Sequence, residues 1–348
     1  MSSSNVTKEG LEGARPGREA TTGANTGPGR SGPPAGRWRR KHRAEAPMVP
    51  EATFSSYYGQ PVINRPTWRA PDIPGYLFLG GLAGAGSVIA AGAQLTGRPV
   101  LARTMKSGCA AAVGLSLTAL IHDLGRPGRF LNMLRTFKPT SPMSVGTWLL
   151  SAYAPMAAAA ALSDLTGVAP WAGTAATAAA AAAGPSVASY TAALIADTAV
   201  PAWHDGYRYM PFVFGSSAVS AAAGLGLAGA PLAETRPVTR LAVVAGTAEI
   251  ITKKVLEKRM GLPGEAYEQG KARRYGQIAS IATAAGVLTT ALLGRRSRAA
   301  AAAAGAALLI GSAMTRFSIF EAGLESARDP RYTVVPQRQR LRERQAPS

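Results

Sequence analysis

Metal-binding side chains are scarce in this sequence, which has one cysteine and three histidines among 348 residues. A single cysteine cannot form a disulfide within the chain, and it cannot supply the thiolates of a four-cysteine zinc or iron–sulfur site. Three histidines are too few to ligate an array of several haems. Any metal chemistry in which the protein takes part must therefore come mostly from a partner.

Charge is scarce as well: 16% of the residues are charged, against roughly 25% in a typical soluble domain. Lys and Arg nevertheless outnumber Asp and Glu by 38 to 19, which gives a net charge of +19. A nucleic-acid-binding protein gathers such charge on a folded face, whereas a membrane protein places it in loops on one side. Here the basic residues fall in the N-terminal region and between apolar segments, and this distribution favours a membrane protein.

The N-terminal region is basic and rich in Gly and Pro. Residues 1–70 contain 11 Lys and Arg against 5 Glu, a composition that cannot bury a core. We predict that residues 1–50 form a disordered basic tail. The basic run at 37–43 is not followed closely by an apolar stretch, so we interpret it as a topogenic or lipid-facing patch rather than a cleaved signal.

Apolar segments long enough to cross about 30 Å of hydrocarbon recur from residue 73 onward. They are rich in Ala and Gly, and the four-residue spacing of Gly80 and Gly84 allows close approach of helices in lipid. The chain is therefore predicted to be an all-α integral membrane protein. The segments lie at 73–96, 107–124, 143–163, 168–203, 207–229, 237–256, 275–294 and 299–321.

The segment 168–203 is either one long helix or two short helices that meet at Gly184 and Pro185. If the basic N-terminus is cytoplasmic, one helix here leaves 29 Lys and Arg on the cytoplasmic side and 8 outside, whereas two helices give about 20 and 17. The positive-inside tendency favours one helix, eight spans and two cytoplasmic termini.

We accordingly expect two four-helix bundles. The expected divisions are a tail at 1–50, a pre-helix segment at 51–72, a first bundle at 73–205, a second bundle at 206–322 and a basic C-terminal tail at 323–348.

The loop after the second apolar segment is long and distinctive. From Asp123 to Trp148 it reads DLGRPGRFLNMLRTFKPTSPMSVGTW, with four basic residues and no acid after Asp123. A positive-inside loop with interfacial aromatic anchors would explain the charge alone, but the three prolines indicate a loop shaped for docking. The candidate docking residues are Arg126, Arg129, Arg135 and Lys138.

This loop resembles the signature of the NrfD/PsrC family of polysulfide-reductase-type membrane subunits. Two further stretches resemble the same family: YLFLGGLAG at 76–84, and YTAAL at 190–194 followed by AVPAW at 199–203. The resemblance covers roughly residues 57–205, and the second half of the chain agrees in the number and spacing of its helices.

The resemblance implies a quinone-interacting anchor in the cell membrane, as in anaerobic respiration. Such a subunit carries no metal of its own and exchanges electrons and protons with a menaquinone-like quinone. Its partners would be a four-cluster ferredoxin-like iron–sulfur subunit and a molybdenum-type catalytic subunit.

A quinone that takes up two electrons also takes up two protons, so its pocket needs hydrogen-bond donors and a proton path. Tyr190 lies about 12 Å deep in its helix at 1.5 Å per residue, and Asp197, seven residues later, is expected on the same face. The family places its quinone-binding tyrosine in this segment, although Ala192 stands where the family commonly has Gly. An interfacial anchor for Tyr190 and a headgroup position for Asp197 are the alternatives.

Further polar candidates flank the first two helices. His122 and Asp123 end the second helix, where an imidazole beside a carboxylate could shuttle protons; a polar helix end at the interface is the alternative. The family motif supports Asp123 but not His122, a position that varies. Three further candidates precede the first helix: Asn64, Trp68 and Asp72. They could cover the quinone pocket, or they could serve only as surface anchors.

Two charged residues, Glu249 and Arg316, lie inside predicted spans, where charged side chains usually face the protein interior or a polar path. Glu249 has Lys253 four residues later, so a local ion pair is one explanation. An ion pair that locks the second bundle and a proton-conducting role are the others.

Two other classes of function remain open. A haem-b membrane subunit would use His122 and His204 as axial ligands, but His204 is expected in a loop. A secondary transporter would show an inverted repeat or paired broken helices, and neither is evident in the sequence.

Overall fold

The computed structural model describes residues 6–7, 10–11, 62–64, 66–126 and 128–345. The chain divides into two compact units, Met1–Gly59 and Gln60–Ser348. In the first unit, β1 (Val6–Thr7) and β2 (Gly10–Leu11) pair as antiparallel strands. The rest of the predicted N-terminal tail, and residues 51–61 of the pre-helix segment, lie outside the described residues.

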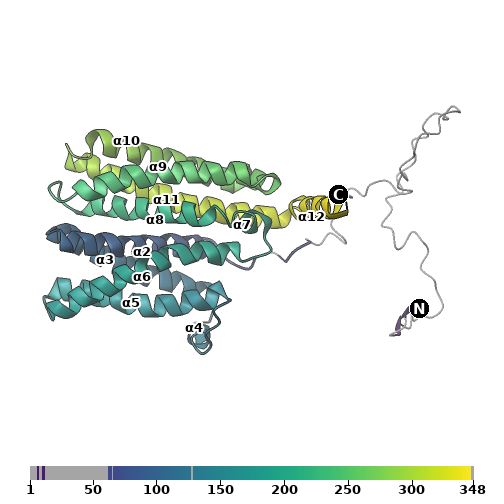
Figure 1. The fold of residues 1–348 in the computed structure, drawn as a ribbon, viewed down its shortest axis with the longest axis horizontal. Coiled ribbons are helices and arrows are strands. Elements are labelled where there is room, and N and C mark those ends of the chain that lie inside the picture. Colours follow the sequence, from purple (N-terminus) through teal and green to yellow (C-terminus); the bar gives the residue numbers. More distant parts are fainter. Residues whose placement is uncertain (1–5, 8–9, 12–61, 65, 127, 346–348) are drawn as a thin grey trace. The chain divides into compact units, whose positions relative to one another are not determined.

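The second unit contains eight long helices, one for each predicted segment (Figure 1). Seven of those in the described residues are long and apolar enough to cross a membrane. The eighth, α9, has eight charged residues, mostly in its last two turns. The protein is therefore an all-α integral membrane protein. The helices are α2 (Asp72–Leu95), α3 (Pro99–Asp123), α5 (Pro142–Thr166), α6 (Pro170–Ala196), α8 (Met210–Gly229), α9 (Arg236–Arg259), α10 (Gly270–Leu293) and α11 (Arg298–Arg328).

The ambiguous segment forms one helix. α6 runs without interruption for 27 residues and contains Pro185 in its interior. A proline removes one backbone hydrogen bond, but in a membrane bundle the packing of neighbouring helices tolerates this loss. The single helix agrees with the distribution of basic residues along the chain.

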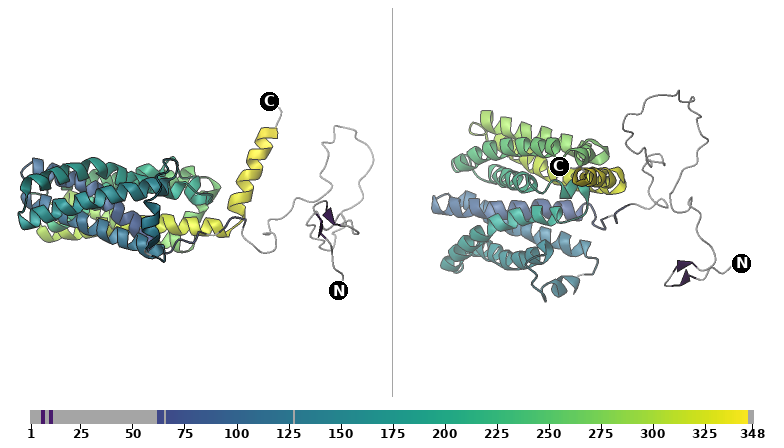
Figure 2. Two further views of the ribbon diagram at one scale, coloured as in Figure 1. Left: turned by 90° about the horizontal axis from the view of Figure 1, so that it is seen from below. Right: turned by 45° about the vertical axis from the view of Figure 1, so that its right-hand side comes forward.

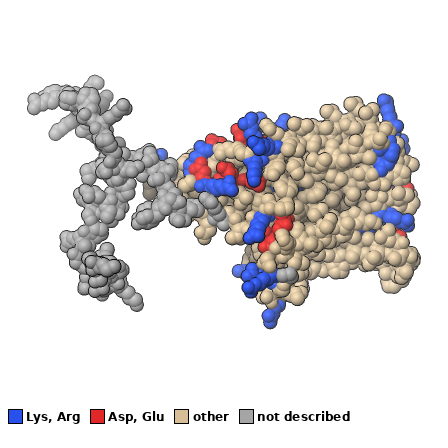
Figure 3. All heavy atoms as spheres, turned by 180° about the vertical axis from the view of Figure 1, so that it is seen from behind, with Lys and Arg blue, Asp and Glu red and all other residues tan. Residues whose placement is uncertain are grey.

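Because successive helices alternate in direction, their connections fall at two ends. We call the end that carries residues 124–141 the loop end; it also holds the short helices α4 (Gly128–Met133) and α7 (Pro201–His204), the 3-10 helix η2 (Leu262–Glu268), and α12 (Arg331–Gln345). α12 leaves the end of α11 at an angle (Figure 2). On the face seen in Figure 3, charged side chains gather near the two ends, and the band between them is uncharged, as a lipid environment requires.

The eight helices form two four-helix bundles. α2, α3, α5 and α6 pack together in the first, and α8, α9, α10 and α11 in the second, with α2 against α8 between them. At the crossing of α2 and α6, a Cβ on Gly84 would lie 2.4 Å from the carbonyl oxygen of Gly184. At the crossing of α8 and α11, a Cβ on Gly305 would lie 2.3 Å from the carbonyl oxygen of Gly224. Small residues thus allow close contacts at both crossings, as the sequence predicts for Gly84.

Helix α11 is longer than the sequence suggests. It has 31 residues and continues to Arg328, beyond the predicted end at residue 321, and α12 follows where the sequence indicates a basic tail. A high mean hydropathy identifies only the part of a helix that crosses lipid. It does not detect polar turns that extend the helix into water, so the predicted segment is shorter than the helix.

Candidate functional site

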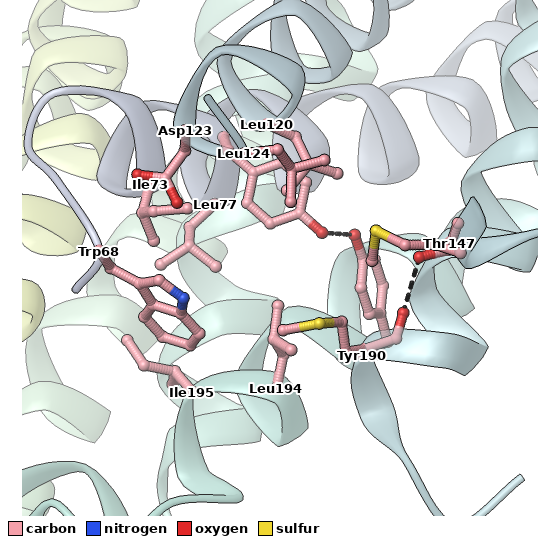
Figure 4. A pocket seen from close by; sticks show the side chains of 13 residues that line it. Trp68, Ile73, Leu77, Leu120, Asp123, Leu124, Thr147, Tyr190, Leu194 and Ile195 are labelled. Carbon is pink, nitrogen blue, oxygen red and sulfur yellow. Dashed lines mark hydrogen bonds between the residues drawn. The ribbon is translucent and has the colours of Figure 1, made fainter. Parts of the chain in front are cut away.

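A narrow pocket of about 50 Å³ opens at the loop end of the first bundle. Most of its lining is apolar, and five side chains bring polar atoms to it. Figure 4 shows Tyr190 and Thr147 on one side of the pocket and Trp68 and Ile195 on the other. The lining residues are Trp68, Ile73, Tyr76, Leu77, Leu120, Asp123, Leu124, Met133, Met143, Thr147, Tyr190, Leu194 and Ile195.

Two tyrosines from different helices meet in the pocket. The hydroxyl of Tyr76 on α2 is hydrogen-bonded to the hydroxyl of Tyr190 on α6 (Figure 4). Tyr76 is only 2% exposed. The ring of Tyr190 lies against the backbone of α5, because a Cβ on Gly146 would come within 2.3 Å of its Cε2 atom. The phenol pair is therefore fixed by three helices.

Trp68 forms a wall of the pocket from the segment that precedes α2. Its ring stacks on Trp203 of α7, with 5.6 Å between ring centroids and 28° between planes. Trp203 is 1% exposed, and its Nε1–H donates to the carbonyl oxygen of Ile319 on α11 at 2.8 Å. The pre-helix segment is thus held in place by both bundles.

Asp123 brings a carboxylate to the pocket. Its Oδ1 accepts a hydrogen bond from the backbone N–H of Arg69 at 3.1 Å, which ties the end of α3 to the segment before α2. Beside the pocket, the Nδ1 of His122 lies 2.8 Å from the Oδ2 of Asp72. The His122 side chain is 76% exposed and that of Asp72 is 16% exposed. The structure therefore places an acid inside the pocket and an imidazole–carboxylate pair beside it.

Two sequence candidates lie away from the pocket. Asn64 is exposed, and Asp197 is exposed at the end of α6. The helix stops at Ala196, and Asp197 has φ −80° and ψ 67°. The seven-residue spacing that places Asp197 on the face of Tyr190 applies only within a helix, so it does not bring the carboxylate to the phenol.

The long loop has its own internal order. The Ser144 hydroxyl accepts from the backbone N–H of Lys138 at 3.0 Å and donates to the carbonyl oxygen of Thr136 at 3.1 Å. The Trp148 ring meets Phe137 edge to face. The four basic candidates are all exposed, at positions 126, 129, 135 and 138. The loop therefore presents a basic surface beside the pocket mouth, to which it also contributes Met133.

Tyr76 is the main site residue that sequence reasoning missed. It appears there only as the first residue of the YLFLGGLAG stretch, although a signal was available. Tyr76 is four residues from the start of α2, and Tyr190 is six residues from the end of α6. At 1.5 Å per residue, both phenols lie within about 9 Å of the loop end.

The intramembrane charges lie outside this pocket. Glu249 on α9 is 1% exposed and Arg316 on α11 is 0% exposed, both in the second bundle. Among the described residues, no ion pair joins Glu249 to Arg316 or to Lys253, and Lys253 instead lies 3.9 Å from Glu257. Nor do the described residues bring three or more His, Cys, Asp or Glu together as a metal site.

Comparison with models of protein families matches residues 63–244 to polysulphide reductase, NrfD. The match covers slightly more than half of the chain and includes the whole pocket, from the segment before α2 to the first part of α9. No curated protein matches the sequence significantly.

Proposed function

Because the chain belongs to the NrfD polysulphide reductase family, whose members are quinone-interacting membrane subunits of reductase complexes, we propose that it exchanges electrons and protons between a menaquinone-like quinone and an iron–sulfur partner. The partner would be a four-cluster ferredoxin-like subunit attached to a molybdenum-type catalytic subunit. The pocket at the loop end of the first bundle is the proposed quinone site.

The hydrogen-bonded pair of Tyr76 and Tyr190 is the observation that carries this proposal. A phenol can donate a hydrogen bond to a quinone carbonyl oxygen. With two phenols in series, the hydroxyl that donates to the quinone can itself accept a hydrogen bond from the second. The apolar walls supply the contact surface that a quinone ring and its lipid-soluble tail require.

The pocket must widen to receive a quinone ring. Its volume of about 50 Å³ is well below the roughly 300–1,000 Å³ of a typical small-molecule site. Met133 and Met143 line the pocket at the side of the long loop, and the unbranched methionine side chain changes shape readily. Movement of these side chains is the proposed route of entry.

Protons would reach the pocket from the loop end. Asp123 lines the pocket, and the exposed His122 with its partner Asp72 lies at the adjoining surface. An imidazole beside a carboxylate can shuttle protons. We assign Asp123 as the proton relay, with His122 and Asp72 as its surface extension.

Electrons would arrive at the same end. The exposed basic surface of the loop, at Arg126, Arg129, Arg135 and Lys138, favours an acidic surface on the partner. Docking there places the partner's clusters beside the proposed quinone site. The excess of basic residues at the loop end also favours its cytoplasmic orientation in the cell membrane, with both chain termini on that side.

Substitution of Tyr190 in the intact complex tests the proposal. Y190F removes the hydroxyl and keeps the ring, so we expect quinone-linked turnover to fall at least 10-fold while the complex still assembles. Y207F is the matched control, because Tyr207 is exposed at the loop end outside the pocket. Normal turnover by Y190F, or purification of a complex without an iron–sulfur partner, would contradict the proposal.

A further inference from the structure

The second bundle contains three buried charged residues that the quinone site does not use. Glu249 is 1% exposed, Lys253 is 5% exposed and Arg316 is 0% exposed. Charged side chains in a membrane interior are costly, and they commonly mark paths for ions or protons. A structural explanation would need each charge to be neutralised by a close partner.

The opposite charges of Glu249 and Arg316 act on each other, but their direct contacts leave polar atoms of both side chains without a hydrogen-bond partner among the described residues. Glu249 Oε1 accepts from the Thr315 hydroxyl at 2.9 Å, and its Oε2 has no hydrogen-bond partner among the described residues. Arg316 donates through Nη2 to the carbonyl oxygen of Phe214 at 3.0 Å and lies over that ring, but its Nε and Nη1 have no partner in the same part of the chain. Buried polar atoms of this kind are normally completed by ordered water.

An open cavity with several charged lining residues reaches Lys253 from the side of η2. This vestibule, of about 560 Å³, lies between α9, α10 and η2, and its charged lining residues are Lys253, Glu257, Glu268 and Arg273. At its inner end the Lys253 ammonium donates to the carbonyl oxygen of Gly276 at 2.8 Å and to the Ser280 hydroxyl at 3.4 Å. The Lys253 side chain, which is 5% exposed, therefore contacts a cavity large enough for many waters.

Polar groups continue inward from the vestibule. Glu249 precedes Lys253 by four residues, which places both on one face of α9. It lies ten residues from the end of α9 at Arg259, about 15 Å along the helix axis. The Thr315 hydroxyl adjoins it, and the hydroxyls of Ser217 and Ser312 are paired one turn further at 2.7 Å.

Beyond this point apolar side chains pack beside the buried hydroxyls of Ser220 and Thr283. A Cβ on Gly246 would lie 2.4 Å from Val287 and 3.4 Å from Leu308, and a Cβ on Gly286 would also contact Leu308. The vestibule lies near the loop end, because its lining includes Glu268 of η2 and Arg273 in the first turn of α10.

We propose that the second bundle contains a proton-entry path that begins in this vestibule, passes Lys253 and ends at Glu249. A proton delivered by water adds to the Oε2 of Glu249 and leaves by the same route, so that the carboxyl group acts as a proton-loading site. The charged groups that act on Glu249 are Arg316 from α11 and Lys253 from α9. Glu257 from α9, Arg273 from α10 and Glu268 from η2 line the vestibule together with Lys253. The path is separate from the quinone pocket and gives the protein a second proton site.

Cysteine accessibility in the full chain tests whether water enters the path. Cys109 is the only native cysteine and is buried, so C109S provides the background. S280C and Q277C place a thiol in the vestibule, and L288C, a position 61% exposed on the same helix, is the lipid-facing control. We expect a charged, water-soluble methanethiosulfonate to modify S280C and Q277C at least 10-fold faster than L288C, and N-ethylmaleimide to modify all three.

Reaction of S280C and Q277C with N-ethylmaleimide alone would show a lipid-filled groove and would overturn the proposal. Absence of reaction with either reagent would overturn it as well. This readout does not depend on quinone turnover, so the failure of the proposed function and the failure of the proton path can be told apart. Y190F in the S280C background should lose turnover and keep the labelling.

Infrared spectroscopy tests the end of the path. We expect a carboxylic acid band that appears and disappears with pH, is absent from E249Q, and shifts quickly in D₂O. K253M should slow the D₂O shift at least 10-fold, because it interrupts the route and leaves the carboxyl group in place. A band that does not titrate, or that shifts equally fast in K253M, would show a purely structural role for Glu249.

Discussion

The phenol hydroxyls of Tyr76 and Tyr190 are hydrogen-bonded to each other across helices α2 and α6. The residues are 114 positions apart in the chain, and both line the pocket at the loop end of the first bundle. This pair is the proposed hydrogen-bond donor to a quinone carbonyl. The first prediction follows from the coupling of the two hydroxyls.

Y76F should impair quinone-linked turnover about as strongly as Y190F, because each substitution breaks the same hydrogen-bonded pair. The double variant should be little worse than either single variant, since residues in one hydrogen-bonded unit are not additive. A double-mutant cycle of turnover in the purified complex measures this. Additive losses would mean that the two phenols act independently.

G146A should disturb the site without removing a polar group. The new methyl group would come within 2.3 Å of the Tyr190 ring, so the ring must move and its hydroxyl with it. We expect weaker quinone binding, with a KM raised at least several-fold. G114A is the matched control, because a Cβ at Gly114 meets nothing within 4 Å and Ala favours a helix by about 0.5–1 kcal/mol over Gly. An unchanged KM in G146A would remove Tyr190 from the binding site.

D123N should separate the structural and proton-transfer roles of Asp123. The amide oxygen can still accept the hydrogen bond of the Arg69 backbone N–H, so the fold should persist, but the group can no longer carry a proton. We expect slower turnover and a larger solvent deuterium isotope effect, with unchanged thermal stability. Equal turnover and isotope effect in the variant and the wild type would exclude a relay through Asp123.

Charge reversal in the long loop should weaken partner binding. R135E/K138E places two acids on the exposed basic surface, and the resulting repulsion should be strongest at low ionic strength because salt screens surface charges. Co-purification at two salt concentrations measures the loss. R295E/R296E, at exposed positions between α10 and α11, is the control at the opposite end. Equal losses in both variants would contradict the assignment of the docking surface.

G323A should destabilise the contact between the bundles. A Cβ at Gly323 would overlap the Trp203 ring, and overpacking of this kind typically costs about 1–3 kcal/mol. Because Trp203 stacks on Trp68, the change should also reach the pocket wall, lowering the thermal midpoint and raising the KM for quinone. A lower midpoint with an unchanged KM would show that the wall position is independent of Trp203.

The sequence predicted the number of long helices and their approximate positions, because lipid crossing requires long apolar stretches whatever their neighbours are. Several limits differ: α3 begins at Pro99 and not at residue 107, α6 ends at Ala196 and not at residue 203, and α11 ends at Arg328 and not at residue 321. The long segment at 168–203 illustrates the prediction of helix number. Its hydropathy is compatible with one long helix or two short ones, and the basic residues elsewhere in the chain favoured the single helix that forms α6. The motif of the long loop identified the family for the same reason, since it is a property of consecutive residues.

The site followed from sequence only in part. Three residues predicted for the site do line the pocket: Tyr190, Asp123 and Trp68. Two others that were predicted, Asp197 and Asn64, do not. Asp197 was placed by helical periodicity, which fails because α6 ends at Ala196. The pairing of Asp72 with His122 joins residues from two helices, and no local pattern encodes such a contact.

The amino-acid sequence by itself determined that this is a basic, cysteine-poor, multi-span helical membrane protein of a quinone-interacting family. Only the tertiary structure decided that Tyr76 completes the pair with Tyr190, that Trp203 holds Trp68, and that Glu249 lies below a polar vestibule without an ion-pair partner among the described residues. The physical reason is one of range. Hydropathy and charge act along the chain and can be summed over neighbouring residues, whereas a hydrogen bond or a cavity depends on how helices far apart in sequence are packed together.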